Sequence, residues 1–194
     1  MRSRRRSSCC LRARAWTTRA STASATRWRR LRADMDFAPA IECVLLRPGR
    51  EQALARFFAD LMTVGDDAFF HPHAGDVASL RVIADAPGKD LYLIFVEGDD
   101  VRAYGLLRGW NEGYAMPSLG VAVHPEARAH GLGRLVMDYL EAMARHRGAP
   151  AIRLRVHKDN ARAISLYERR GYAMQIDTSD ARLLVGMKPL EHAR

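Results

Sequence analysis

The chain has 194 residues, a formal net charge of +9 at pH 7 and a sequence pI of about 10.1. Its three cysteines, Cys9, Cys10 and Cys43, supply neither a disulfide framework nor a Cys₂His₂ metal set, and no apolar stretch reaches the length of a membrane span. These features exclude a disulfide-stabilised secreted domain, a zinc finger and a membrane-spanning protein, and they favour a reducing, cytoplasmic compartment.

The excess positive charge lies in the first 34 residues. Residues 1–34 hold eleven arginines and one acidic residue, Asp34, so residues 35–194 carry a formal charge of about −1. The segment has no lysine and no apolar run, and it cannot bury enough apolar area to offset the entropy lost on ordering. We therefore expect a disordered or mis-assigned leader over 1–34 and one folded domain over 35–194.

Three interpretations of the leader stay open. Its charge fits a nucleic-acid-binding arm. Its Arg- and Ser-rich, acid-poor composition fits an organelle transit peptide. Its exclusive use of arginine fits a translation start assigned too far upstream, with Met35 as the true start. The third interpretation fits best, and nucleic acid is not expected as a partner.

The remaining elements follow from apolar patterns of period two and period 3.6. Pro72 interrupts regular structure in the segment 69–76, and 111–117 reads as a loop. In chain order, the predicted elements are a strand over 41–46, a helix over 51–63, a short helix over 77–84, a strand over 90–96, its hairpin partner over 101–110, a strand ending at residue 123, an amphipathic helix from residue 132, a strand over 151–156, a helix over 161–170, and strands over 172–176 and 181–188.

Residues 120–134 combine the end of a strand, a tight turn and the start of a helix. Gly131 and Gly133 let the backbone turn sharply and expose consecutive N–H groups where the helix dipole adds partial positive charge. Such a turn suits a phosphate or pyrophosphate. A Walker loop is excluded because no lysine follows Gly133, and a Rossmann fingerprint is excluded because position 136 is Val136.

A second motif follows the strand over 151–156. Asn160 stands at the N-cap position of the next helix, and Gly171 ends that helix. The two motifs are Arg128-x-x-Gly131-x-Gly133 and the run Asn-x-x-Ala-x-x-Leu-Tyr-x-x-x-Gly-Tyr over 160–172. In type and separation they resemble the hallmarks of the GNAT superfamily of N-acetyltransferases, and the resemblance covers about residues 118–173.

The resemblance implies the mixed α/β GNAT fold, a central, mostly antiparallel sheet with helices on both faces. It also implies acetyl-CoA as co-substrate and no metal. Transferred position by position, it assigns the pantetheine arm to the backbone of Val121, Ala122 and Val123. It assigns binding of the pyrophosphate to the backbone N–H groups of Ala129, His130, Gly131, Leu132, Gly133 and Arg134, with added charge from Arg128 and Arg134. Asn160 would fix the pantetheine end.

Tyr167 would stand near the sulfur as the proton donor to the departing thiolate. The competing interpretation is that Tyr167 is a core residue with a satisfied hydroxyl, because it shares a helix face with Ile164.

The proton acceptor is less defined. Acetylases of ribosomal-protein N-termini, which this region resembles, carry a glutamate in the strand before the Asn helix, where this chain has Arg155. Glu112 is the preferred candidate, beside His71 and His73. His124 is expected to be structural, since it precedes Pro125 at the strand exit. A solvated surface role for Glu112 and turn roles for both histidines stay open.

The acceptor amine is not encoded in a motif. A pocket lined by Phe69, Phe70, Trp110 and Tyr114, with Glu112 or Asp76 holding a cation, would suit a small amine or an amino-sugar. We expect direct transfer of acetyl to such a primary amine. The alternatives are a protein N-terminal or lysine acetyltransferase of the ribosomal-protein type and a non-catalytic acyl-CoA-binding module. The expected partners are acetyl-CoA and the amine, with no membrane, and a homodimer is left open.

Overall fold

The computed structural model describes residues 40–86 and 88–191. The predicted leader over 1–34 lies outside the described residues, and so do its three interpretations and its boundary at Met35. Along the described chain the elements are β1 (Glu42–Leu45), α2 (Glu51–Thr63), the 3₁₀ turn η1 (Asp66–Ala68), α3 (Val77–Asp85), β2 (Leu91–Glu97), β3 (Asp100–Arg108), β4 (Ser118–Val123), the 3₁₀ turn η2 (Pro125–Ala127), α4 (Leu132–His146), β5 (Ala151–His157), α5 (Ala161–Arg169), β6 (Ala173–Ile176) and β7 (Leu183–Pro189). This order confirms the predicted one, to which η1 and η2 are additions.

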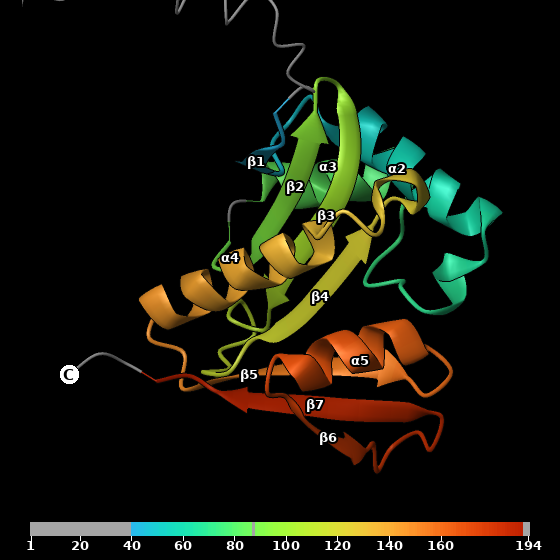
Figure 1. The fold of residues 1–194 in the computed structure, drawn as a ribbon. Coiled ribbons are helices and arrows are strands. Elements are labelled where there is room, and N and C mark those ends of the chain that lie inside the picture. The colour runs from blue at the N-terminus through green and yellow to red at the C-terminus, as the bar shows by residue number, and fades with distance from the viewer. Residues whose placement is uncertain (1–39, 87, 192–194) are drawn as a thin grey trace, which may run out of the picture. The chain divides into compact units, whose positions relative to one another are not determined.

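Seven strands form one mixed sheet in the order β1-β2-β3-β4-β5-β7-β6. All neighbouring pairs are antiparallel except β4 and β5, which run parallel. The β4–β5 ladder contains one register pair, Ser118 with Arg153, whereas β5 pairs with β7 along its whole length from Ala151 to His157. The two central strands therefore meet at one end and separate toward the other, as Figure 1 shows.

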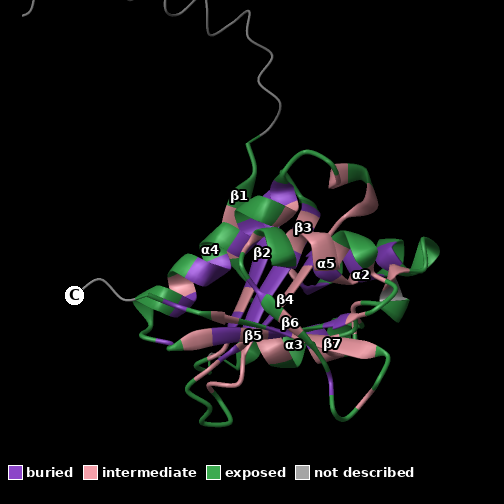
Figure 2. Ribbon diagram, turned by 60° about the horizontal axis from the view of Figure 1, so that its bottom comes forward, coloured by how far each residue is buried: buried purple, intermediate pink, exposed green. Residues whose placement is uncertain are grey.

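Helices cover both faces of the sheet, as predicted. In Figure 1, α4 crosses in front of the strands and α3 passes behind them. Side chains alternate along β3, so Ala103 and Leu107 enter the apolar cluster under α4 and α5, while Tyr104 and Leu106 enter the cluster under α2 and α3. Buried residues accordingly line the strands in Figure 2.

The helix α4 lies very close to β3. A β-carbon on Gly105 would come within 2.8 Å of the Val136 side chain, so the strand carries glycine where the helix crosses it.

Among the described residues, no helix is long and apolar enough to cross a membrane.

One buried carboxylate ties the C-terminal elements together. Glu141 on α4 is only 4% exposed and accepts hydrogen bonds from Arg170 Nε at 2.9 Å and Lys188 Nζ at 2.7 Å. Arg170 follows α5 and Lys188 belongs to β7, so one side chain fixes α4 against both. A carboxylate buried this far is tolerated because both cations reach it.

We expect Glu141→Gln to lower the free energy of unfolding by about 3 kcal/mol, because it leaves two cations without their shared counter-ion. Urea denaturation followed by circular dichroism measures the loss. Asp138→Asn is the matched control: Asp138 also contacts Arg170, at 2.6 Å, but is 54% exposed, so its loss should stay below about 1 kcal/mol. Equal losses for the two variants would contradict the role of Glu141.

Candidate active site

A cleft of about 1240 Å³ opens where β4 and β5 separate. Its walls come from the segment between α2 and α3, the end of β3 with the loop after it, the strands β4 and β5, the helix α5 and the β6–β7 loop. The lining includes Asn160 and Tyr167 from the second sequence motif and Val121 from the strand before the first. Segments far apart in the sequence thus meet around one opening.

The backbone of β4 turns alternate residues toward this opening. His124 N–H donates to Arg102 O of β3 at 2.9 Å, whereas Pro117 O, on the opposite edge, accepts from Arg153 N–H at 3.0 Å. Peptide groups of a strand alternate between its two edges, so Val121 and Val123 present theirs to the β5 side. Ala122 instead pairs with Tyr104 of β3. Of the three residues assigned to the pantetheine arm, two therefore offer backbone groups on the cleft side.

The predicted turn after β4 has the backbone of an anion site. Ala129 and Gly131 both adopt left-handed φ angles, 68° and 81°, and Gly131 is the N-cap of α4 without a side-chain cap. The first N–H groups of α4 consequently have no side-chain partner at that end. Ala129, His130 and Gly131 are exposed, while Leu132 is buried under the helix. The geometry fits a pyrophosphate held by main-chain N–H groups.

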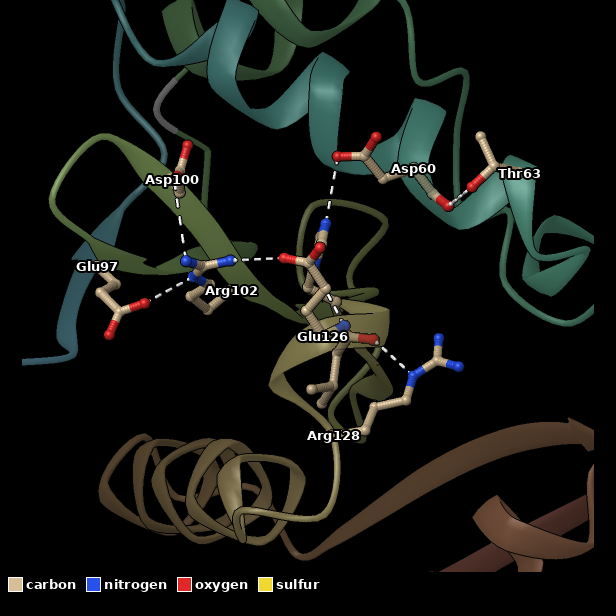
Figure 3. A network of polar contacts seen from close by, with 9 residues as sticks. Asp60, Thr63, Glu97, Asp100, Arg102, Glu126 and Arg128 are labelled. Atoms are coloured by element: carbon tan, nitrogen blue, oxygen red, sulfur yellow. Dashed lines mark hydrogen bonds and ion pairs between the residues drawn. The ribbon is translucent and has the colours of Figure 1, made fainter. Parts of the chain in front are cut away.

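Polar contacts fix the approach to this turn (Figure 3). Arg102 on β3 reaches Glu97 at 2.8 Å and Glu126 of η2 at 3.4 Å. His124 contacts Asp60 of α2 through Nε2 at 3.2 Å and accepts from Glu126 N–H, and its side chain is 12% exposed. These contacts give His124 a positioning role at the strand exit.

The two predicted arginines of the turn differ. Arg128 donates through Nε to Val123 O at 3.2 Å and is ion-paired with Asp66 of η1. Burial, and then the nearby Arg162, lower the pKa of Arg128. The Arg134 side chain is 79% exposed, and its contact is Asp138 at 3.9 Å. Arg134 is the more available cation, and Arg128 ties the α2–α3 segment to the end of β4.

Asn160 and Tyr167 lie on the α5 wall of the cleft. Asn160 Oδ1 caps α5 by accepting from Ala163 N–H at 3.1 Å, which leaves its amide NH₂ unused by the cap. Tyr167 is 6% exposed, and burial raises its pKa to about 12. Within residues 40–86 and 88–191, the Tyr167 hydroxyl has no hydrogen-bond partner, although the ring packs against Tyr172 at 5.9 Å. The phenol is therefore protonated at neutral pH and lies at the cleft wall.

The cleft gathers some of the predicted acceptor-side residues. Glu112, which is exposed, lines it together with His71, Phe69, Phe70 and Tyr114.

Three other predicted residues lie elsewhere. Asp76 caps α3 by accepting from Ser79 N–H at 2.9 Å. His73 Nε2 lies 2.8 Å from the Tyr104 hydroxyl, and burial lowers the pKa of His73. Trp110 packs beneath the guanidinium of Arg147, 4.8 Å from its ring centre. The predictions that Asp76 and Trp110 belong to the acceptor pocket are wrong, since each is engaged in a structural contact outside the cleft lining.

The cleft also contains residues that sequence reasoning did not assign. They are Arg108 at the end of β3, Arg153 and His157 on β5, and the pair Asp180 and Arg182 before β7. A signal for the β5 residues was present in the alternation of 152–157, where polar residues at 153, 155 and 157 alternate with apolar ones. The presence of Arg108, Asp180 and Arg182 in the cleft depends on strand register. Among the described residues, no cluster of three or more His, Cys, Asp or Glu side chains could hold a metal ion.

Comparison with known proteins agrees with this geometry. The model of the acetyltransferase (GNAT) family matches residues 57–172, and the chain belongs to this family. The chain is 33% identical over 102 residues to acetyltransferase SG1711 of Sodalis glossinidius, a match covering 53% of this chain and 68% of the relative.

Solved structures share the fold at lower identity. The PaiA N-acetyltransferase of Thermoplasma acidophilum, in complex with coenzyme A, superposes with a TM-score of 0.65 at 15% identity, over 77% of this chain and 99% of that one. The ribosomal-protein-S18-alanine N-acetyltransferase of Escherichia coli superposes with a TM-score of 0.60 at 19% identity, over 80% of this chain and 97% of that one. YncA of Salmonella typhimurium, solved with its cofactor acetyl-CoA, superposes with a TM-score of 0.64 at 19% identity, over 80% of this chain and 97% of that one. The chain is thus a GNAT-family acetyltransferase with acetyl-CoA as co-substrate.

We expect Gly131→Ala to weaken coenzyme A binding about 5- to 10-fold, because a β-carbon at φ +81° costs about 1–2 kcal/mol and shifts the N–H groups of the turn. Isothermal titration calorimetry measures the dissociation constant. Gly148→Ala is the matched control: Gly148 has φ +75°, also in open space, but follows the far end of α4. Both variants should lose similar stability, and only Gly131→Ala should lose affinity. Equal affinities would contradict the anion role of the turn.

Proposed function

We propose that the protein transfers the acetyl group of acetyl-CoA directly to a primary amine of a small molecule or amino-sugar. The observation that carries the proposal is the separation of β4 from β5, which leaves the cleft-side backbone groups of Val121 facing a wall that contains Tyr167. In this arrangement the pantetheine arm lies along β4, and the pyrophosphate rests on the turn at Gly131.

The reaction needs a neutral amine and a stabilised leaving group. A lysine-like amine with a pKa near 10.4 must lose a proton, which costs about 4.6 kcal/mol at pH 7. Glu112, at the rim of the cleft, takes this proton directly or through water. The amine nitrogen then attacks the thioester carbon, and a β4 N–H group polarises the carbonyl oxygen. The carbon–sulfur bond breaks as Tyr167 donates its proton to the thiolate, and the second proton leaves the acetylated nitrogen and returns Tyr167 to its neutral form.

Two observations favour catalysis over acyl-CoA binding alone. Asn160 and Tyr167 both line the cleft, and the Tyr167 hydroxyl is not committed to another described residue. A pure binding module would not need a protonated phenol at the thioester end. The side chain at position 155 favours a small amine over a protein terminus, because Arg155 replaces the glutamate that the ribosomal-protein type carries there. Because the S18-alanine enzyme of Escherichia coli shares this fold, a protein acceptor is the second candidate. Cytoplasmic location and a homodimer stay predictions.

Tyr167→Phe should lower kcat about 100-fold with little change in acetyl-CoA affinity, because the substitution removes the proton donor and keeps the buried ring. A thiol-release assay gives kcat, and calorimetry gives the affinity. Tyr139→Phe, on α4 and 39% exposed, is the control and should leave kcat unchanged. Unchanged turnover in Tyr167→Phe would refute the donor role.

The high pKa of Tyr167 sets the alkaline side of the pH profile. With a pKa of about 12 the phenol stays protonated through pH 10, whereas an ordinary tyrosine with a pKa near 10 would be half ionised there. We expect kcat to rise as the amine is deprotonated and to show no fall centred near pH 10. Circular dichroism at each pH controls for unfolding. A fall in kcat centred near pH 10 in the folded enzyme would contradict this assignment.

Thiol release from acetyl-CoA across a panel of small amines, amino-sugars and peptides tests the function itself. The expected result is turnover with small amines that exceeds hydrolysis without acceptor. Turnover with peptides alone would select the second candidate, and coenzyme A binding without turnover on any acceptor would select the binding module.

A further inference from the structure

We infer that the acetyl acceptor carries an anionic group, a carboxylate or a phosphate, which Arg108 and Arg153 bind beside Ser118 on the floor of the cleft. The inference rests on the proposed function and narrows its substrate class to small anionic amines.

The three residues form a row across adjacent strands. Arg108 of β3 is in register with Ser118 of β4, and Ser118 is in register with Arg153 of β5. Neighbouring strands lie about 4.8 Å apart, so the two arginine backbones are roughly 10 Å apart with Ser118 between them. All three residues line the cleft.

The alternation of β5 turns its cationic side chains into the cleft. Ile152, Leu154 and Val156 enter the core cluster under α4 and α5. Arg153 and Arg155 alternate with them and therefore project from the opposite face, where the α2–α3 segment forms the other wall.

Two of the four cleft arginines already have carboxylate partners. Arg155 Nε lies 2.6 Å from Asp177, whose side chain is 4% exposed, and Arg182 Nη2 lies 2.8 Å from Asp180.

The other two cleft arginines, Arg108 and Arg153, have no carboxylate partner among the described residues. The Arg153 side chain is half-buried and forms no hydrogen bond or ion pair with any described residue, and the Arg108 guanidinium donates to the Pro72 carbonyl. Glu112 is the remaining carboxylate of the lining, and it is exposed in the loop after β3.

Physical chemistry favours an anion at this row. Two guanidinium groups flanking a small polar residue repel each other and lose part of their hydration in the cleft. A carboxylate or phosphate that accepts hydrogen bonds from both relieves the repulsion and matches the planar donor fork of arginine. Ser118 adds a hydroxyl donor between them.

The phosphates of coenzyme A do not account for these cations. The pyrophosphate turn follows Val123, at the opposite end of β4 from Ser118. Five residue steps along the strand lead from Ser118 to Val123, which corresponds to roughly 16 Å. The row therefore lies at the acceptor end of the cleft, where the anion belongs to the second substrate.

Matched acceptor pairs test the inference with the full chain. The members of each pair differ in the anionic group and are compared at equal concentrations of the neutral amine: an α-amino acid and its amide, and glucosamine 6-phosphate and glucosamine. The expected result is a kcat/KM at least about 10-fold higher for the anionic member of one pair. The pair that responds identifies carboxylate or phosphate.

Variants then connect the preference to the row. Arg153→Gln should raise KM for the preferred anionic acceptor about 10- to 100-fold and leave its neutral partner within about 2-fold, whereas Arg153→Lys should keep part of the preference. Arg145→Gln removes an equal charge from the exposed end of α4 and should change the KM of neither the anionic nor the neutral acceptor. Melting temperatures confirm that each variant is folded.

The outcomes separate this inference from the proposed function. Absence of thiol release with every acceptor would overturn the proposed function. Turnover that is equal or better with neutral acceptors, and insensitive to Arg153→Gln, would overturn the anion inference alone. A preference for acidic peptides over both small anionic amines would also overturn it.

Discussion

The site depends on two parallel strands that pair at one end only. Unpaired peptide groups are costly in a protein interior, yet beyond Ser118 the β5-facing edge of β4 has no partner strand, although the Val123 carbonyl accepts from Arg128. Each strand is instead paired along its other edge, β4 with β3 over six residue pairs and β5 with β7 over seven. The open edge then faces a cleft, where a ligand with amide groups can take the place of a neighbouring strand.

Contacts between the two parts of the sheet keep this opening in shape. The apolar cluster under α4 and α5 spans both parts, from Leu107 on β3 to Ile152 on β5, and the Glu141 carboxylate adds a polar tie to β7. On the opposite face, the ion pair of Arg128 with Asp66 joins the end of β4 to the α2–α3 segment. The cleft is therefore bounded by elements that are fixed independently of one another.

The sequence predicted what is local and missed what depends on register. The turn at Gly131 and the cap at Asn160 are short patterns, and both occur where expected. Asp76 was misassigned although Asp-x-x-Ser before an apolar run is a helix-start signal, and the structure shows this cap. No local pattern could align Arg108 with Arg153, since their proximity comes from pairing across three strands.

The chemistry at position 155 follows from a single buried carboxylate. Hydrogen bonds from Ser179, followed by Arg155, lower the pKa of Asp177 to about 2, so this carboxylate stays ionised as a counter-ion and is a poor proton acceptor at pH 7. Asp177 is thus a counter-ion on the β5 side of the cleft, and the proton acceptor that we propose, Glu112, lies in the loop after β3. Although residues 35–194 carry almost no net charge, the fold gathers four arginines and the carboxylates of Glu112 and Asp180 around one cleft, the combination that the proposed anionic amine would use.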